Sequence, residues 1–283
     1  MTTKPAGTLY LVGTPIGNLE DMTLRAIRVL KECDAIACED TRQTQKLLNH
    51  FGIETRTVSY HEHNERERAA ELVAQMEQGR SVAVVTDAGM PGISDPGYRL
   101  VTIAVEHNIP VVPIPGACAF LAALVASGLP TDSFRFNGFL PSRLGQRRTA
   151  LEQIKGSQIT EIYYEAPHRI VATLQDIVEV LGANRSVVVA REVTKIHEEF
   201  LRMKASDALA ELTKRGEVRG EITLLIDRAE EGEAPAVEHK SVRQRVRELM
   251  QSQGIDEREA LKRVAKELGV SKSEVYREFQ KGK

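Results

Sequence analysis

The chain has 283 residues, of which 42% are hydrophobic and 28% charged, and its formal net charge is −2. This is the profile of an ordinary globular protein, long enough for two modest domains or for one large domain with an appendage. Membrane and secreted proteins are disfavoured, because no apolar run approaches the roughly 20 residues of a membrane helix and the apolar stretch near the N-terminus is too short for a signal peptide. We therefore expect a cytoplasmic protein.

Short apolar runs alternate with helical patterns through the first half of the chain. Strands are expected at residues 8–12, 34–38, 55–60, 81–85 and 111–115. Helices are expected at residues 22–33, after Asn64, and at about 96–107. Asn64 and Glu67 have the spacing of a capping box at the start of the second helix. This alternation, with strands that are almost wholly apolar, predicts a parallel sheet that helices cover on both faces.

The second half has a more mixed pattern. Strands are expected at residues 134–140, 161–166, 186–192, 198–203 and 220–227, and helices at 146–155, 168–181 and 205–215. A short segment containing TKIH separates the third and fourth of these strands, which indicates a hairpin and therefore antiparallel pairing. The sequence thus predicts two α/β domains, one of residues 1–116 and one of residues 117–228.

Residues 229–240 are acidic, contain Gly and Pro, and predict a linker. The pattern of residues 241–283 is wholly helical, with short helices expected at 242–253, 257–268 and 272–280 and capping boxes at Asp256 with Glu259 and at Ser271 with Glu274. From Lys240 onward there are 12 Lys and Arg against 7 Asp and Glu. This basic helical module suits a polyanionic partner, although packing or dimerisation is an equally good interpretation.

Three turns rich in Gly and Pro accompany strands of the first half, at residues 12–18 (VGTPIGN), 85–97 (VTDAGMPGISDPG) and 111–120 (VVPIPGACAF). Ligands of doubly wound parallel sheets bind beyond the carboxyl ends of strands, and Gly lets the backbone approach a ligand closely. The turns therefore predict a ligand cleft. The first turn has neither a GxGxxG nor a GxxxxGK[ST] pattern, which disfavours a dinucleotide or a nucleoside triphosphate.

The cysteines and histidines predict neither a disulfide framework nor a metal site. Cys33, Cys38 and Cys118 are odd in number and sit among apolar or small residues, so we expect small buried side chains. His61 and His63 form an HxH pair without a third clustered ligand, so no bound metal is expected.

Several long motifs together resemble the tetrapyrrole methylase superfamily. They are VGTPIGNLEDMTLRAIRVLKECDAIACEDTRQTQKLL, VTDAGMPGISDPGYRLV, VVPIPGACAFLAAL, GFLP and YYEAPHRI, within a likeness that covers residues 7–227. Within the superfamily the chain is similar to the branch of bacterial ribosomal RNA small subunit methyltransferases. The resemblance implies two α/β domains of the tetrapyrrole methylase type with a cofactor cleft between them, plus a small C-terminal helical module. It also implies S-adenosylmethionine as the cofactor.

The resemblance further implies a reaction and its partners. Members of the branch are understood to methylate the ribose 2′-hydroxyl of a cytidine in the decoding region of 16S rRNA. The implied partners are therefore 16S rRNA within the small ribosomal subunit and a second copy of the chain in a homodimer. PIGN in the first turn replaces a more glycine-rich run, which disfavours a porphyrin-type substrate. Two alternatives stay open, a methylase of a small tetrapyrrole-like molecule and a ligand-sensing regulator that binds nucleic acid.

The turn at residues 85–97 is expected to wrap the cofactor, with DAGMPGIS in place of the GDP-type motif usual in the superfamily. The residues expected to line the cofactor are Pro15, Asp87, Ala88, Gly89, Gly92, Ile93, Ser94, Gly116, Ala117, Cys118, Tyr164 and Ile222.

A neutral ribose hydroxyl is a poor nucleophile, so a positioned base should accelerate its methylation by about 10²–10⁴-fold. The segments CEDTR and SYHEHNE follow expected strands and supply the candidate bases, ranked Asp40, Glu39 and His61. The structural alternatives are an ion pair between Glu39 and Arg42 and a merely exposed histidine. Because Arg suits phosphate and Lys adds positive charge, RNA contacts are expected at Arg42, Arg169, Lys195, Lys272 and Arg277.

Overall fold

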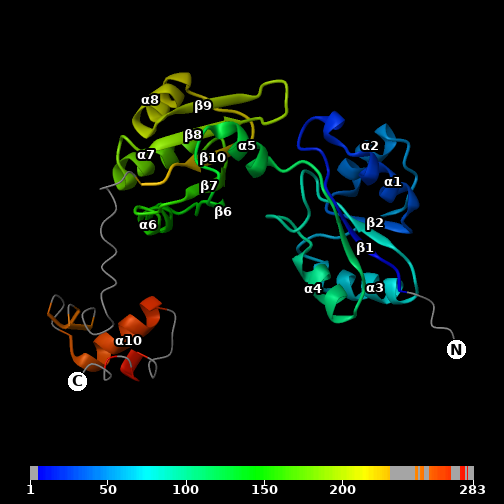
Figure 1. The fold of residues 1–283 in the computed structure, drawn as a ribbon, viewed down its shortest axis with the longest axis horizontal. Helices are drawn as coiled ribbons and strands as arrows, with labels where there is room; N and C mark the ends of the chain where they lie inside the picture. The colour runs from blue at the N-terminus through cyan, green and yellow to red at the C-terminus, as the bar shows by residue number, and fades with distance from the viewer. Residues whose placement is uncertain are drawn as a thin grey trace. The chain divides into compact units, whose positions relative to one another are not determined.

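The computed structural model describes residues 6–229, 246–247, 249–251, 255–268, 275–277 and 279. The chain forms two compact units, Met1–Arg228 and Ala229–Lys283. The larger unit contains two five-stranded sheets, labelled strand by strand in Figure 1. In the part of the chain that the structure describes, no helix has both the length and the apolar character needed to span a membrane.

The first sheet of the larger unit is wholly parallel, with the strand order β3-β2-β4-β1-β5. Its strands are β1 (Leu9–Val12), β2 (Ala35–Cys38), β3 (Thr57–Ser59), β4 (Val82–Val84) and β5 (Val111–Ile114). The five strands expected in the first half and their parallel pairing are confirmed. Because β1 lies between β4 and β5, the carboxyl ends of these three strands meet at one edge of the sheet, where the Gly-rich turns follow them.

Helices cover both faces of this sheet, as predicted. They are η1 (Leu19–Asp21), α1 (Leu24–Glu32), α2 (Thr41–His50), α3 (Glu65–Glu77) and α4 (Tyr98–Glu106). Ile36 and Cys38 pack in the core cluster that contains residues of α1 and α2, whereas Ala37 between them packs in the cluster of α3 and α4. Figure 1 shows α1 and α2 on one side of the sheet and α3 and α4 on the other.

The start of α3 differs from the prediction. Asn64 has helical backbone angles and makes no side-chain cap to the helix, so the expected capping box is wrong. Its side-chain oxygen instead accepts the amide N–H of His61 at 2.9 Å, and its side-chain amide donates to the Ser59 carbonyl at 3.2 Å. Asn64 therefore closes the turn between β3 and α3.

The second sheet is mixed, with the order β6-β7-β10-β8-β9. Its strands are β6 (Phe134–Phe139), β7 (Thr160–Glu165), β8 (Ser186–Arg191), β9 (Glu199–Lys204) and β10 (Ile222–Ile226). Only β6 and β7 pair in parallel, and β8 and β9 form the predicted antiparallel hairpin. The helices α6 (Leu144–Gln153), α7 (Ile170–Leu181) and α8 (Ala205–Arg215) pack on one face, and α5 (Ala119–Ser127) packs on the other.

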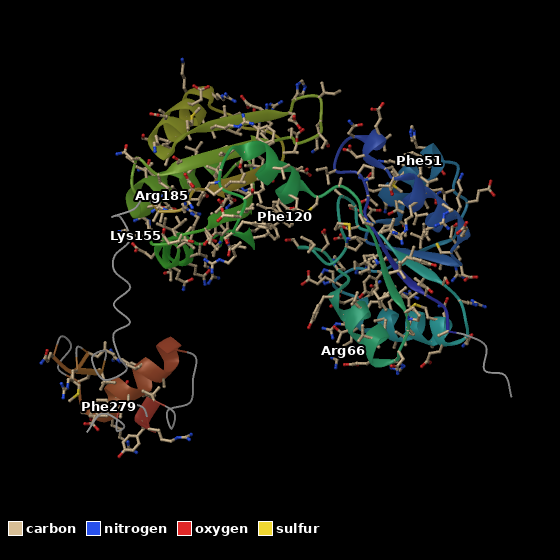
Figure 2. All side chains as sticks on the ribbon, viewed as in Figure 1. Phe51, Arg66, Phe120, Lys155, Arg185 and Phe279 are labelled. Atoms are coloured by element: carbon tan, nitrogen blue, oxygen red, sulfur yellow. The ribbon has the colours of Figure 1, made fainter. Side chains whose placement is uncertain are left out.

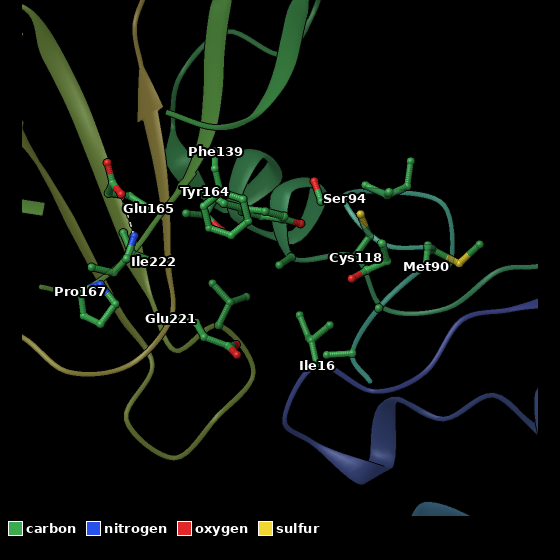
Figure 3. Close-up of a pocket in the computed structure, with 18 residues that line it drawn as sticks. Ile16, Met90, Ser94, Cys118, Phe139, Tyr164, Glu165, Pro167, Glu221 and Ile222 are labelled. Carbon is green, nitrogen blue, oxygen red and sulfur yellow. Dashed lines mark hydrogen bonds between the residues drawn. The ribbon is translucent and has the colours of Figure 1, made fainter. Parts of the chain in front are cut away.

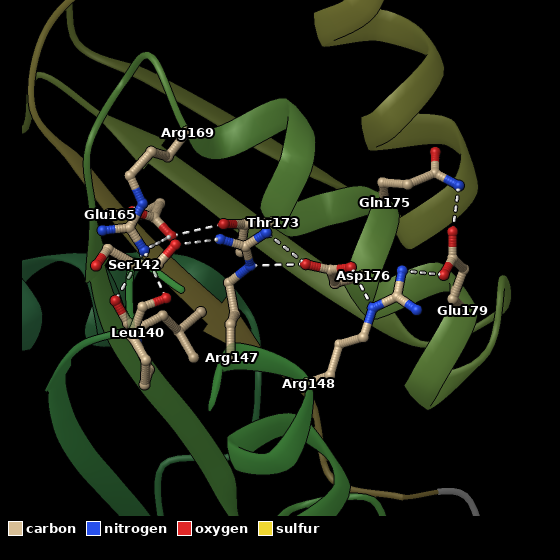
Figure 4. A network of polar contacts seen from close by, with 11 residues as sticks. Leu140, Ser142, Arg147, Arg148, Glu165, Arg169, Thr173, Gln175, Asp176 and Glu179 are labelled. Carbon is tan, nitrogen blue, oxygen red and sulfur yellow. Dashed lines mark hydrogen bonds and ion pairs between the residues drawn. The ribbon is translucent and has the colours of Figure 1, made fainter. Parts of the chain in front are cut away.

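Three arginines link the second sheet and its helices. In Figure 4, Arg147 and Arg148 of α6 flank one carboxylate, that of Asp176 on α7. Arg147 Nε donates to Asp176 Oδ2 at 2.7 Å and Arg148 Nε to Oδ1 at 2.8 Å. At another point, Arg185 donates to the carbonyl oxygen of Lys155 at 2.8 Å, and both residues are labelled in Figure 2.

The smaller unit has an apolar core of its own, and α10 (Glu257–Leu268) supplies half of it. The amide of Glu259 donates to Asp256 Oδ1 at 2.7 Å, so Asp256 caps this helix as predicted. The core residues are Val246, Leu249, Ala260, Leu261, Val264, Ala265, Val275 and Phe279, the last of which is labelled in Figure 2. The predicted Ser271 and Glu274 capping box, Lys272 and the linker residues 230–240 lie outside the described residues.

Candidate active site

A cavity of about 360 Å³ lies in the larger unit, between turns that leave the first sheet and strand ends of the second (Figure 3). Its volume is in the range of small-molecule sites. The first sheet, its turns and the start of α5 supply Ile16, Ala88, Gly89, Met90, Ile93, Ser94, Asp95, Cys118 and Ala119. The second sheet and its loops supply Phe139, Tyr164, Glu165, Ala166, Pro167, Val193, Glu221, Ile222 and Thr223.

The turn after β4 reaches the cavity in an unusual backbone conformation. Gly89 and Gly92 have φ of 89° and 82°, a region that favours glycine. Ser94 has φ of 61°, which is uncommon for a residue with a side chain. The turn therefore needs its glycines, and it holds Ser94 and the adjacent Asp95 in fixed positions at the cavity wall.

The turns after β1 and β4 are fastened to each other. Thr14 and Gly89 exchange backbone hydrogen bonds of 2.9 and 3.2 Å. The buried hydroxyl of Thr14 also donates to the carbonyl of Thr86 at 3.0 Å. Two turns that are 75 residues apart in the sequence thus form one wall of the cavity.

The second sheet supplies an aromatic wall. The ring of Tyr164 makes edge contacts with Phe136 and Phe139, with centroid distances of 4.9 and 5.6 Å. Burial raises the pKa of Tyr164 to about 12, so the phenol stays neutral at physiological pH. Among the residues that the structure describes, no Lys, Arg or His lines the cavity, so a cationic ligand meets no cationic side chain from this part of the chain.

Asp95 carries the most perturbed carboxylate of the site. Burial raises the pKa of Asp95 to about 6, the nearby Thr86 hydroxyl opposes the shift, and the charges of Glu39 and Asp87 add to it. Burial also raises the pKa of Glu39, with Asp87 as the next cause. These three carboxylates therefore concentrate negative charge beside the cavity.

Two more cavities adjoin the first. One of about 710 Å³ shares Ser94 and Asp95 with it and is lined by further acidic residues, including Glu39. The other, of about 440 Å³, shares Ile16, Ala88 and Glu221 with it. Asp95 therefore lies on the wall between the first cavity and a wider, more open one.

The structure brings together many of the residues expected to line a cofactor. The predicted residues that line the 360 Å³ cavity are Ala88, Gly89, Ile93, Ser94, Cys118, Tyr164 and Ile222. Pro15 and Asp87 line the 440 Å³ cavity instead. Gly92, Gly116 and Ala117 lie in the same turns but line none of these three cavities.

The three ranked bases lie around the site rather than in it. Asp40 is the N-cap of α2, where its Oδ1 accepts the Arg42 amide at 2.8 Å. Glu39 lines the 710 Å³ cavity. His61 packs edge-on against His63, with ring centroids 5.9 Å apart. Their catalytic roles stay predictions.

The basic residues expected to bind RNA have different environments. Arg42 is exposed on the first turn of α2, and Arg277 is exposed in the smaller unit. Arg169 is partly buried, donates to the Leu140 carbonyl at 2.8 Å and pairs with Glu165 (Figure 4). Lys195 pairs with two glutamates, and Lys272 lies outside the described residues. RNA contact by these five residues stays a prediction.

Sequence reasoning did not select several residues of the cavity. Asp95 stands in the quoted turn, and Phe139 and Glu165 stand in the quoted motifs GFLP and YYEAPHRI. Those motifs were a usable signal for the region. Met90 stands in the same quoted turn as Asp95. Val193 and Glu221 had no such signal, because the pairing of β10 with β7 and β8 brings their segments to the cavity.

The fold is that of a known class. Residues 8–209 match the family described as tetrapyrrole (corrin/porphyrin) methylases. Uroporphyrin-III C-methyltransferase from Thermus thermophilus, solved with S-adenosylhomocysteine, has a TM-score of 0.54 at 22% identity and covers 78% of this chain and 97% of its own. A diphthine synthase has a TM-score of 0.62 at 13% identity, with 78% and 90% covered. At these identities the likeness concerns the fold.

Curated relatives narrow the class. Ribosomal RNA small subunit methyltransferase I of Halalkalibacterium halodurans is 50% identical over 277 residues, which cover 95% of this chain and 93% of the relative. Its namesake in Synechocystis sp. is 46% identical over 270 residues, with 95% and 96% covered. The chain therefore belongs to the ribosomal RNA small subunit methyltransferase I family of tetrapyrrole methylases.

Proposed function

We propose that this protein transfers a methyl group from S-adenosylmethionine to the ribose 2′-hydroxyl of a cytidine in the decoding region of 16S rRNA. The observation that carries the proposal is the place of Asp95, on the wall shared by the 360 Å³ cavity and the wider 710 Å³ cavity. Two relatives that align with nearly the whole chain are both named ribosomal RNA small subunit methyltransferase I, which supports ribosomal RNA as the substrate.

The cavity residues fit S-adenosylmethionine. This cofactor has an apolar, flat adenine ring and two cationic groups, a sulfonium and an ammonium. Apolar side chains such as Ile16, Met90 and Ile222 line much of the cavity, and they suit the ring. The carboxylate of Asp95, with Glu39 and Asp87 close by, provides the negative potential that suits the cations. When bound, the cofactor supplies an electrophilic methyl carbon.

Asp95 is the base in this proposal, in place of the three candidates ranked from the sequence. A carboxylate with a pKa of about 6 is deprotonated at neutral pH and close enough to neutrality to accept a proton from a hydroxyl in the transition state. The fixed turn around Ser94 positions it, beside the aromatic wall of Tyr164 and Phe139. The 2′-hydroxyl enters from the 710 Å³ cavity.

The test is methyl transfer from labelled S-adenosylmethionine to small ribosomal subunits and to naked 16S rRNA from cells that lack this protein. The RNA is digested and the labelled nucleoside identified. Label in 2′-O-methylcytidine at one decoding-region position supports the proposal. Label on a base keeps an RNA enzyme but overturns the ribose assignment. Absence of label in either RNA, with the cofactor still bound, overturns the RNA substrate and favours a small tetrapyrrole-like molecule.

Two further expectations belong to this proposal. An enzyme of ribosomal RNA acts in the bacterial cytoplasm, where ribosomes are. The homodimer rests on the family resemblance, and mass measurement of the purified protein by light scattering tests it independently of activity.

A further inference from the structure

The loop that joins β8 and β9 presents an apolar tip to solvent. The side chain of Ile196 is 97% exposed, and His197 beside it is also exposed. Single exposed apolar residues are common on protein surfaces and by themselves need no explanation. The construction of this loop sets Ile196 apart.

The backbone of the loop is strained. Glu192 has φ of 53° and Thr194 has φ of 70°. For a β-branched residue such as Thr194 this conformation is a true outlier, and it persists only where the surroundings enforce it. Here the Thr194 amide donates to Glu198 Oε2 at 2.7 Å. The Glu192 amide donates to the Glu221 carbonyl oxygen at 2.9 Å, and the Glu221 amide donates to Glu192 Oε1 at 2.9 Å. These hydrogen bonds hold the loop below the tip in one conformation.

Lys195 anchors the foot of this loop next to the cavity of the proposed reaction site. Its ammonium lies 2.9 Å from Glu192 Oε1 and 2.9 Å from Glu221 Oε2. Its stem covers Gly17, where a Cβ atom would lie 2.3 Å from Lys195 Cγ. Glu221 lines the 360 Å³ cavity, and in Figure 1 the loop reaches toward the first sheet. Lys195 itself lines the adjoining 440 Å³ cavity, so the loop that carries the tip borders the site.

The charges of the loop indicate the kind of contact that it makes. Lys195 is neutralised by two carboxylates, so the anchor contributes little net positive charge to attract phosphate. What the tip offers is an apolar side chain and an imidazole, which are side chains that pack on the faces of unstacked nucleotide bases.

We infer that Ile196 and His197 form a rigid tip that packs against unpaired bases next to the target nucleotide and holds the RNA with its ribose at Asp95. The inference rests on the proposed function and adds a positioning contact to it. Lys195 and Glu192 position the tip.

The test compares the wild-type protein with the double variant Ile196→Ser, His197→Ser in methyl transfer to small ribosomal subunits. We expect KM for the subunit to rise about tenfold, which lies within the range that one stacked base contributes. The Kd of S-adenosylmethionine and the Tm should stay unchanged. Ile196→Leu should keep KM within about twofold of the wild type, because it keeps the apolar surface.

Leu24→Ser is the matched control, since Leu24 is 86% exposed on α1, and its KM should equal that of the wild type. An unchanged KM in the double variant overturns the inference while the wild-type methylation still supports the proposed function. A loss of activity that accompanies a fall in molecular mass overturns it too, because the tip would then be a contact between copies of the chain. If the wild type methylates no RNA, the proposed function fails, and the inference fails with it.

Discussion

Gly13 and Gly116 touch through their backbones where the turns after β1 and β5 meet. A Cβ atom on Gly13 would lie 2.8 Å from the Cα of Gly116, and one on Gly116 would lie 2.9 Å from the Cα of Gly13. Both turns go on to supply residues of the cavity, Ile16 from the first and Cys118 from the second. The shape of the cavity therefore depends on the absence of two side chains.

Gly116→Ala should separate these turns and weaken cofactor binding. Overpacking of this kind costs about 1–3 kcal/mol, so we expect a lower Tm and at least about a tenfold higher Kd for S-adenosylmethionine by titration calorimetry. Gly145→Ala is the control, because a Cβ atom on Gly145 in α6 meets nothing within 4 Å. That change should leave Kd unaltered. Unaltered binding by Gly116→Ala would show that the turns adjust without disturbing the site.

Asp95→Asn should lower kcat about 10²–10⁴-fold, the usual contribution of a general base. In the wild type, kcat should rise tenfold per pH unit below pH 6 and level off above it, because the pKa of Asp95 is about 6 and the carboxylate is the active form. Single-turnover rates from pH 5 to 8 measure this profile.

Glu39→Gln is the matched control for the base, because Glu39 belongs to the same group of carboxylates but lines only the open cavity. Its charge is one of the causes that raise the pKa of Asp95. The variant should therefore move the break in the pH profile to a lower pH and keep the plateau rate. A plateau that falls as far as in Asp95→Asn would make Glu39 the base.

Asp95→Asn should also stabilise the protein at neutral pH. The pKa of Asp95 is higher in the folded state, about 6, than the 3.8 of a solvated aspartate side chain, so the folded state binds the proton more tightly. The stability linked to this proton is complete below pH 3.8 and is lost as the pH rises through 6. Asp95→Asn should raise the free energy of unfolding by roughly 1–2 kcal/mol at pH 7.5, and by almost nothing at pH 4.

Calorimetric Tm values of Asp95→Asn and the wild type at both pH values measure this difference. A gain that is equal at pH 4 and pH 7.5 would contradict titration of Asp95 as its cause.

The sequence predicted the elements whose residues carry a clear pattern. The alternation of polar and apolar residues in 205–215 gave α8 (Ala205–Arg215) at its observed bounds. Two helices escaped prediction for opposite reasons. α2 is mostly polar and buries only Thr44 and Leu48, so its apolar face is short. α5 is apolar on nearly every side, so it has no period to detect.

The site was predicted where it depends on local turns and missed where it depends on packing. Gly89 and Ser94 belong to a turn whose composition alone indicates close approach to a ligand. The raised pKa of Asp95, however, comes from burial and from Glu39 and Asp87. Asp87 belongs to the same turn as Asp95, but Glu39 follows β2, so strand order decides whether Glu39 meets them. A sequence does not state that order.

Arg147 and Arg148 bind the same carboxylate, that of Asp176, from different environments. The side chain of Arg147 is 7% exposed and that of Arg148 is 42% exposed, while Asp176 is 2% exposed. Arg147→Ala leaves the buried Asp176 carboxylate paired with the exposed Arg148 alone. The change should lower the free energy of unfolding by about 3–5 kcal/mol.

Arg148→Ala should cost much less, because Arg147 still pairs with Asp176 and water screens the lost pair. Urea denaturation of both variants measures the contrast. Equal losses would mean that burial does not govern the strength of this network.

Arg42 and Arg169 separate RNA binding from stability. Arg169 donates to the carbonyls of Leu140 and Pro141 at 2.8 and 3.0 Å and pairs with the buried Glu165. Arg169→Ala should therefore lower the unfolding free energy by about 3 kcal/mol.

Arg42 is exposed at the start of α2. Arg42→Ala should leave the Tm unchanged, weaken binding to the small subunit, and reduce the slope of log K against log salt by about 0.7–0.9. Filter binding at several salt concentrations measures the affinity for the small subunit and its salt dependence. Lys46→Ala, a basic neighbour on the same helix, is the control. An unchanged slope for Arg42→Ala, or a normal Tm with weaker RNA binding for Arg169→Ala, would reverse the roles of the two arginines.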